Sequence, residues 1–568
     1  MLPSPAAIAS KLSARAFDAL TVVGLLLASV VVSLRALRDG GLFFDDWWIR
    51  GQALYGGGSE ENSVFERIGP LWELVGFRPG SFVLANVQNV LIDISPRLLQ
   101  VTGALTIALL AAAVYAFLVV ARLPRIWAAA TALLVVTIPV ASTTRYWAAA
   151  QMMAVAVTLA FAALALIGSG VRREHTGRTV GGIVLFGVAV STYEIVIPLA
   201  LLAAFIAFQG GAGLRRIALV TAGTLAAAGI AYFARPTGRN SVQPFGAWDD
   251  HARVFLEQGG ELLGSSLTPD GPWGWLMLAG VVAITVTALV LARRGTREVL
   301  DGPRTAPASA HGSDTVPRAP RGPLTTPAAG ALLAVLGLAV VVLGYLTLIP
   351  AEPWYQPLQP GQGTRVNGVA AVGYAMVVAG VMIIVSTAIT RSVLLAPRVA
   401  PGATVALAFL LIGGFAAGYA QENRGDGDQY IAAYTRAQEL IAAFEETVPE
   451  SALRPGTTML SFGRPGYVAP LVQSLGEWSD LDGALKEAFG SGQIQAYPIF
   501  ETQEVICGPR GVELPLQYVG GPVYGPGYDR PYGKLLFVQA PERRWTRITS
   551  REVCQRELAR YPRAALNF

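Results

Sequence analysis

Long apolar runs recur along the first 420 residues, and the short segments between them carry charged side chains. A helix that crosses a bilayer needs about 20 predominantly apolar residues. A shorter run at 126–141 approaches that length, and the clear candidates are 18–38, 98–120, 146–168, 214–234, 273–292, 326–349, 366–389 and 402–420. The stretch 179–209 is too long for one comfortable span and short for two. This pattern predicts a mostly α-helical, polytopic membrane protein.

The placement of arginine decides how the stretch 179–209 is interpreted, because cytoplasmic loops of membrane proteins are enriched in Lys and Arg. If the stretch is a hairpin that turns at Tyr193 and Glu194, the arginine clusters all share the side of the N-terminus; they lie at 122–125, 172–178, 215–216, 293–297 and 391–398. The hairpin also lifts Glu194 out of the hydrocarbon, where a charged residue costs about 2.5–3.5 kcal/mol. We therefore expect about eleven spans, with the N-terminus in the cytoplasm and the C-terminus outside.

This topology divides the chain into a membrane domain at 1–420 and an extracytoplasmic tail at 421–568. The tail alternates helix-like and strand-like runs, which predicts a small C-terminal α/β or α+β domain; the helix-like runs are 429–447 and 470–489, and the strand-like runs are 457–462, 494–499 and 535–540. The first outside loop covers 39–97. The segment 294–324 is rich in Pro, Ala, Arg and Gly, and is predicted to be a disordered cytoplasmic linker.

Composition supports the membrane assignment. Only 14% of residues are charged and 53% are hydrophobic, against about 25% charged in ordinary soluble domains. The formal charge of +5 is too small to indicate a nucleic-acid partner. Neither a P-loop nor a G-x-G-x-x-G turn is present, so no nucleotide site is expected. Cys507 and Cys554 both lie in the tail, where an oxidising compartment favours a disulfide between them.

The most informative segment is Phe43-Phe-Asp-Asp-Trp-Trp48, directly after the first span. The two tryptophans suit a membrane interface. Asp45 and Asp46 are adjacent carboxylates that repel each other, and such a pair can tune one member as a general base. Spacing alone also fits an acidic turn that caps a helix, since Asp is a good N-cap.

The same loop continues with Phe77-Arg-Pro-Gly-Ser81. An Asp doublet followed by Arg-Pro and then a second span resembles the GT-C superfamily of membrane glycosyltransferases, most closely branches that modify bacterial surface polysaccharides. The resemblance covers about residues 18–420. It implies a plasma-membrane enzyme that moves a sugar from a polyprenyl-phosphate carrier to a cell-envelope glycan, with inversion at the anomeric carbon. It also implies that Asp45 or Asp46 is the base, that Arg78 lines the site, and that a divalent cation is possible at the doublet.

Further charged and polar residues are predicted on the same membrane face. Each alone is more often an interfacial anchor, but together they offer the carboxylates and guanidinium groups that a lipid phosphate and a sugar acceptor need. These candidate donor-phosphate and substrate-binding residues are Arg145, Tyr146, Glu194, Arg235, Arg239, Glu352, Arg365 and Asn367. His251 follows two aspartates in another outside loop, where a solvated loop is favoured over a metal site.

Two other functions remain open at this stage. A flippase or transporter of lipid-linked glycans should carry charges within its spans, whereas here the charges gather at one face. An O-antigen-type polymerase would also use outside arginines but does not require the Asp doublet. The sugar, its linkage and the acceptor are not determined by the sequence.

The arginine distribution predicts that a reporter fused after Phe568 lies outside the cell. The measurement is the activity of a reporter that works on only one side of the membrane. A cytoplasmic C-terminus would contradict both the eleven-span topology and the hairpin at Glu194.

Overall fold

The computed structural model describes most of the chain between Ala14 and Arg560. The described residues are 14–43, 45–56, 61–235, 245–268, 326–351, 356–358, 363–393, 400–462, 467–468, 472–473, 475, 478–499, 505–514 and 529–560. The expected span at 273–292 and the linker at 294–324 lie outside them, as do Arg239 and Glu352.

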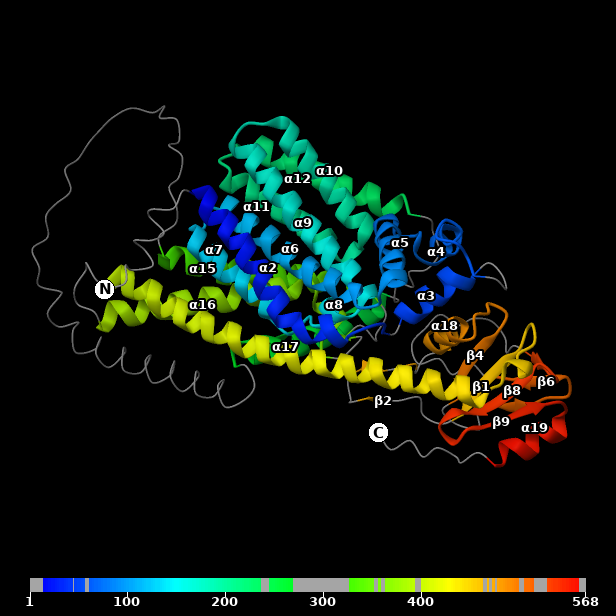
Figure 1. Cartoon of the computed structure of the whole chain (residues 1–568). Coiled ribbons are helices and arrows are strands. Elements are labelled where there is room, and N and C mark those ends of the chain that lie inside the picture. The colour runs from blue at the N-terminus through cyan, green and yellow to red at the C-terminus, as the bar shows by residue number, and fades with distance from the viewer. Residues whose placement is uncertain are drawn as a thin grey trace, which may run out of the picture.

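A bundle of helices forms the larger part of the molecule (Figure 1). Seven of the described helices are long and apolar enough to cross a membrane: α2 (Ala14–Asp39), α6 (Leu98–Val120), α9 (Ala148–Arg172), α12 (Leu214–Phe233), α15 (Thr326–Leu346), α16 (Ala370–Val393) and α17 (Ala400–Thr447). Helices α6, α9 and α16 are buried along most of their length, whereas α2 and α12 expose most of theirs. The chain is therefore a multi-pass helical membrane protein, as its apolar pattern predicts.

The ambiguous stretch divides at Tyr193 into two short apolar segments. Helix α10 (Thr176–Thr192) ends there, and the 3₁₀ helix η1 (Glu194–Leu201) begins at Glu194 and continues into α11 (Leu202–Gln209). Another short apolar helix, α7 (Arg125–Thr137), replaces the longer expected run at 126–141. The break at Tyr193 is the one that the hairpin interpretation requires.

Short helices cover one end of the bundle, where the predicted outside loops lie (Figure 1). The first loop folds into α3 (Asp45–Tyr55), α4 (Ile68–Val75) and α5 (Pro79–Ile94). A single turn, α8 (Thr143–Tyr146), connects α7 to α9, and η3 (Gly363–Asn367) precedes α16. The next loop contains η2 (Phe245–Ala247) and α13 (Trp248–Leu267), which buries His251 and Phe255 on one face and exposes acidic side chains on the other.

The tail is a small α/β domain at the far end of α17 (Figure 1). Its main sheet has the order β4-β1-β8-β9, in which β1 pairs in parallel with β4 and β8, and β9 is antiparallel to β8. The strands are β1 (Thr458–Phe462), β4 (Gln495–Ile499), β8 (Leu535–Gln539) and β9 (Arg544–Ile548). Three of them, β1, β4 and β8, coincide with the predicted strand-like runs; β1 and β8 lie in the centre of the sheet and are buried throughout, whereas β4 is an edge strand.

Different elements cover the two faces of this sheet. Helix α18 (Trp478–Ala488) and the end of α17 pack on one face, together with residues of the first outside loop. The other face packs against α19 (Arg551–Leu558) and a smaller sheet. This sheet has the order β5-β6-β7, with β5 (Ile506–Cys507), β6 (Gly511–Glu513) and β7 (Asp529–Pro531). The other described elements of the tail are the strand pair β2 (Tyr467–Val468) and β3 (Val472–Gln473) and the 3₁₀ turns η4 (Glu450–Ala452) and η6 (Ala540–Glu542).

Helix α17 crosses the expected domain boundary at residue 420 without a break. It is 48 residues long and includes the whole predicted tail helix 429–447. Hydropathy falls where the helix leaves the bundle, but helix-forming residues such as Ala, Glu, Gln and Arg continue. The composition changes at residue 420, whereas the secondary structure does not.

A disulfide bond joins Cys507 of β5 to Cys554 of α19, whose Cα atoms are 6.0 Å apart. Both side chains lie within the apolar cluster on the outer face of the main sheet. Replacing both cysteines with serine should lower the free energy of unfolding of the tail by about 2–4 kcal/mol, since the cross-link closes a long loop. Mass spectrometry of a non-reduced digest tests the bond, and thermal unfolding of the double variant tests its effect. Two free thiols in the native protein would remove the bond from this description.

Candidate active site at the start of helix α3

The carboxylate of Asp46 is buried and bonded to the protein backbone. Its side chain is 4% exposed, and both carboxylate oxygens accept hydrogen bonds from backbone N–H groups. Oδ1 accepts from Ala149 at 2.8 Å; Oδ2 accepts from Phe43 at 3.1 Å and from Ala148 at 3.3 Å. One carboxylate at the start of α3 therefore caps the first N–H groups of α9 and also bonds the backbone just before α3. Burial raises the pKa of Asp46, and these backbone donors oppose that rise.

Asp45 is placed differently, although it is the neighbouring residue. Its side chain is only partly buried, and none of the described residues donates a hydrogen bond to its carboxylate. Burial raises the pKa of Asp45, while the positive charge of Arg365 opposes the rise. A carboxylate with a raised pKa and unoccupied oxygens can accept a proton from a hydroxyl group.

Arg365 reaches this place from η3, more than 300 residues along the chain. Its guanidinium group lies over the ring of Trp147, 5.3 Å from the ring centre, and its charge acts on Asp45. Trp147 is fully buried at the junction of α8 and α9, directly before the backbone groups that Asp46 caps. The structure thus brings together the expected site residues Asp45, Asp46 and Arg365.

A row of hydroxyl groups fixes η3 beside this site. Tyr430 of α17 donates a hydrogen bond to the Thr143 hydroxyl at 2.9 Å, and the hydroxyl groups of Thr143 and Thr364 are bonded to each other. The ring of Tyr430 also packs edge-on against Phe43, with ring centres 5.0 Å apart. These residues were not predicted from the sequence. The available signal was Tyr430 and Tyr434, which are four residues apart and share one face of the predicted helix 429–447.

Arg78, Glu194 and Arg235 form a second charged cluster, as their predicted positions on one membrane face allow. Arg78 donates two hydrogen bonds to Glu194, at 2.9 Å to Oε2 and 2.5 Å to Oε1, and Arg235 donates to Oε2 at 2.8 Å. The Arg78 guanidinium also lies 3.9 Å from the centre of the Tyr193 ring. This two-point arrangement with a stacked ring is a geometry that arginine provides and lysine does not.

The first two turns of α9 separate the two clusters. Met152 belongs to a small apolar group against which Tyr193 packs. Met153 contacts Gly368, which follows η3 and therefore lies beside Arg365. Three arginines and three carboxylates thus lie around the N-terminus of α9, whose dipole adds partial positive charge; the carboxylates are those of Asp45, Asp46 and Glu194. This end of the bundle is suited to an anionic group.

Three other expected site residues are buried and bonded within the fold. The Tyr146 hydroxyl donates to the carbonyl of Asn423 at 2.6 Å, and the side chain is 1% exposed. Asn367 is fully buried and donates to the carbonyls of Val140 and Pro357, both at 2.9 Å. Arg145 is also buried, at 3% exposed.

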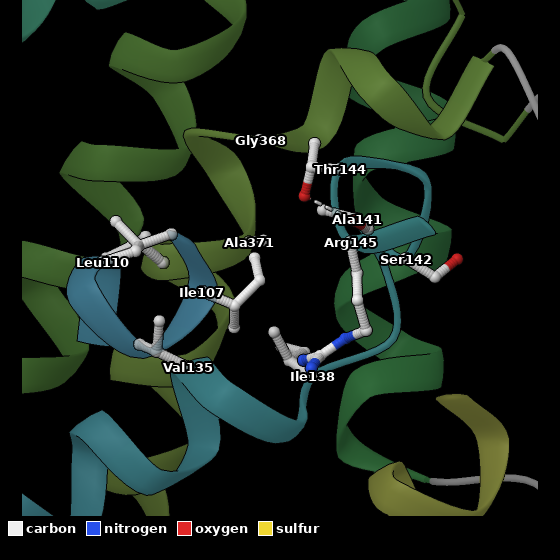
Figure 2. Close-up of a pocket in the computed structure, with 11 residues that line it drawn as sticks. Ile107, Leu110, Val135, Ile138, Ala141, Ser142, Thr144, Arg145, Gly368 and Ala371 are labelled. Atoms are coloured by element: carbon white, nitrogen blue, oxygen red, sulfur yellow. Dashed lines mark hydrogen bonds between the residues drawn. The ribbon is translucent and has the colours of Figure 1, made fainter. Parts of the chain in front are cut away.

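Arg145 lines a small cavity inside the bundle (Figure 2). Its Nη1 donates to the Ser33 hydroxyl at 3.0 Å, and its Nη2 donates to the carbonyl of Val136. The walls are mostly apolar, with Ile107 and Leu110 from α6 and Ala371 from α16. Among the described side chains, no carboxylate is bonded to Arg145, whereas Arg78 and Arg235 are both bonded to Glu194.

No protein-family model matches the chain, and no curated protein matches it. Solved structures of the Archaeoglobus fulgidus oligosaccharyltransferase do: a complex tethered to an acceptor peptide is 14% identical with a TM-score of 0.39. A complex of this enzyme, AglB, with an inhibitory peptide and a dolichol-phosphate is 13% identical with a TM-score of 0.41, and the apo form is 13% identical with a TM-score of 0.38.

These matches cover 85% of this chain but only 63–64% of the archaeal chains, so this chain spans less than two thirds of their length.

In the cluster of Arg78, Glu194 and Arg235, removing the one negative charge is predicted to lower the stability of the protein clearly. Glu194→Gln keeps the shape of the side chain but leaves Arg78 and Arg235 facing each other without a carboxylate. Breaking a buried ion pair in this way costs about 3–5 kcal/mol, so the thermal midpoint of the purified protein should fall clearly. The matched control is Glu73→Gln on the exposed surface of α4. Equal midpoints for the two variants would contradict a structural role for the cluster.

Proposed function

We propose that the protein is a membrane glycosyltransferase that moves a sugar from a polyprenyl-phosphate carrier to a cell-envelope glycan on the extracytoplasmic face. The observation that carries the proposal is the unequal use of two adjacent carboxylates. Asp46 is occupied by three backbone donors, whereas Asp45 is partly exposed beside Arg365. A free carboxylate next to a guanidinium group is what a transfer from a lipid phosphate to a hydroxyl group requires.

The reaction follows from these groups. Asp45 accepts the proton of the acceptor hydroxyl as its oxygen bonds to the anomeric carbon of the donor sugar. The bond between that carbon and the phosphate oxygen breaks, and the polyprenyl phosphate leaves with the bonding electrons. Arg365 stabilises the charge that develops on the phosphate, and the cluster of Arg78 and Arg235 contributes to the positive field. Attack from the face opposite the leaving phosphate inverts the anomeric configuration.

A divalent cation does not fit the described residues. Both oxygens of Asp46 are already engaged by backbone N–H groups. Within the described part of the chain, no three His, Cys, Asp or Glu side chains are grouped as metal ligands. We therefore derive no step through a metal ion, and the charge of the leaving phosphate is assigned to the arginines.

One observation favours a second function, the movement of a lipid-linked glycan across the membrane. Arg145 is a buried arginine within the bundle and lines a cavity (Figure 2), and charges at membrane depth often mark transport pathways. Reconstitution with a labelled polyprenyl-phosphate sugar separates the two functions. A transferase forms a glycosylated acceptor, whereas a flippase changes only the leaflet in which the carrier is found.

Replacing each aspartate with asparagine is predicted to have different effects: Asp45→Asn should lower the transfer rate, and Asp46→Asn should lower the stability. Asp45→Asn should lower the transfer rate by about 10²–10⁴, the usual contribution of a general base, with little change in thermal midpoint. Asp46→Asn places an amide group opposite backbone donors and should lower the free energy of unfolding by about 1–3 kcal/mol. The measurements are transfer from synthetic polyprenyl-phosphate sugars to a glycan acceptor, and thermal unfolding of each variant.

A folded Asp45→Asn protein that transfers sugar at the wild-type rate would overturn the assignment of the base. If Asp46→Asn were fully stable but inactive, the roles of the two residues would be exchanged.

A further inference from the structure

Helix α3 is in close contact with helix α18 of the tail. A glycine on each helix allows this approach: a methyl group added to Gly51 would overlap the Cα of Gly483 and lie 2.8 Å from its carbonyl oxygen. A methyl group added to Gly483 would overlap the carbonyl of Trp47 and lie 2.8 Å from the Cα of Trp48. Because every one of these neighbours is backbone, neither side could move aside by a change of rotamer.

A buried arginine adds a polar connection at the same place. Arg50 of α3 donates to Asp93 of α5 at 2.5 Å and to Glu487 of α18 at 3.4 Å, and its side chain is 8% exposed. Arg67 donates to the other oxygen of Asp93 at 2.5 Å. Helix α3 is thus bonded at one point to the membrane domain and to the tail.

The apolar contacts are continuous across this junction. Trp47 of α3 belongs to the same buried cluster as Leu481 and Leu485 of α18, and this cluster extends to the inner face of the tail sheet. Trp47 also stacks on Tyr434 of α17, with ring centres 6.3 Å apart and an interplanar angle of 21°. The tail and the first outside loop share one core.

We infer that α18 positions the catalytic carboxylate of Asp45 through α3, and that Gly483 and Glu487 are positioning residues for the reaction proposed above. Helix α3 has only 11 residues. Asp46 fixes its first turn against α9, and the contacts of Arg50 and Gly51 fix its middle against α18. These two attachments determine the direction of the helix, and with it the place of Asp45. A displacement of about 1 Å at a reacting group can cost about 10² in rate.

The test compares Gly483→Ala with Gly425→Ala, a matched control on α17 where an added methyl group meets no atom within 4 Å. Gly483→Ala should lower kcat by about 10–100-fold and leave KM for the lipid donor unchanged, because the phosphate-binding arginines lie on other elements. Hydrogen exchange should become faster in the peptide that covers Asp45–Tyr55. It should not change in the tail strands β1 and β8, and Gly425→Ala should behave like the wild type.

A second pair of variants covers the possibility that Gly483→Ala unfolds the tail, which loss of protection in β1 and β8 would reveal. Glu487→Ala removes the bond to Arg50, whereas Glu487→Gln keeps an acceptor at the same position. The alanine variant should accelerate exchange in α3 and lower kcat, and the glutamine variant should restore both.

The inference would be overturned if folded Gly483→Ala kept both the wild-type hydrogen exchange in α3 and the wild-type kcat. If Gly483→Ala unfolds, the same result in Glu487→Ala would overturn it. A wild-type protein that transfers no sugar would overturn the proposed function instead. Hydrogen exchange in α3 of the Gly483→Ala and Glu487→Ala variants would then test, without any activity, whether α18 holds α3 in place.

Discussion

The hydrogen bonds that Asp46 accepts are the interaction on which the outer end of this molecule depends. The first backbone N–H groups of a helix have no partner within the helix, and those of α9 are buried where water cannot bond them. Asp46 satisfies two of them from another element, at 2.8 and 3.3 Å. The outside loop is therefore attached to the membrane domain by an interaction that the bundle itself requires.

The same interaction explains why two identical neighbouring side chains have different surroundings. With Asp46 turned inward, Asp45 at the start of α3 remains partly exposed, next to Arg365. Arg365 is held in turn by its contact with Trp147, which directly precedes the capped N–H groups. The doublet therefore places one carboxylate in the interior, bonded to the backbone, and leaves the other partly exposed beside a guanidinium group.

The sequence predicts most of the architecture, because hydropathy is decided locally. Apolar runs identify the spans, the distribution of arginine identifies the break at Tyr193, and strand-like runs identify β1, β4 and β8. The different roles of Asp45 and Asp46 could not be predicted, since they depend on backbone groups about 100 residues away. The same limit applies to Arg145, which turns into the bundle to bond Ser33 and Val136, although its position in a short turn favoured the surface.

Because helix α17 runs without a break from the bundle into the tail, its length determines how far the tail lies from the bundle and how the tail is rotated about the helix axis. It runs for 48 residues, or about 72 Å at 1.5 Å per residue. One residue inserted where it leaves the bundle would lift the tail by about 1.5 Å and rotate it by about 100°, which turns α18 away from α3. Seven inserted residues would nearly restore the rotation, but the tail would then stand about 10 Å too far from the membrane. The length of this helical segment between the bundle and the tail is therefore strictly constrained.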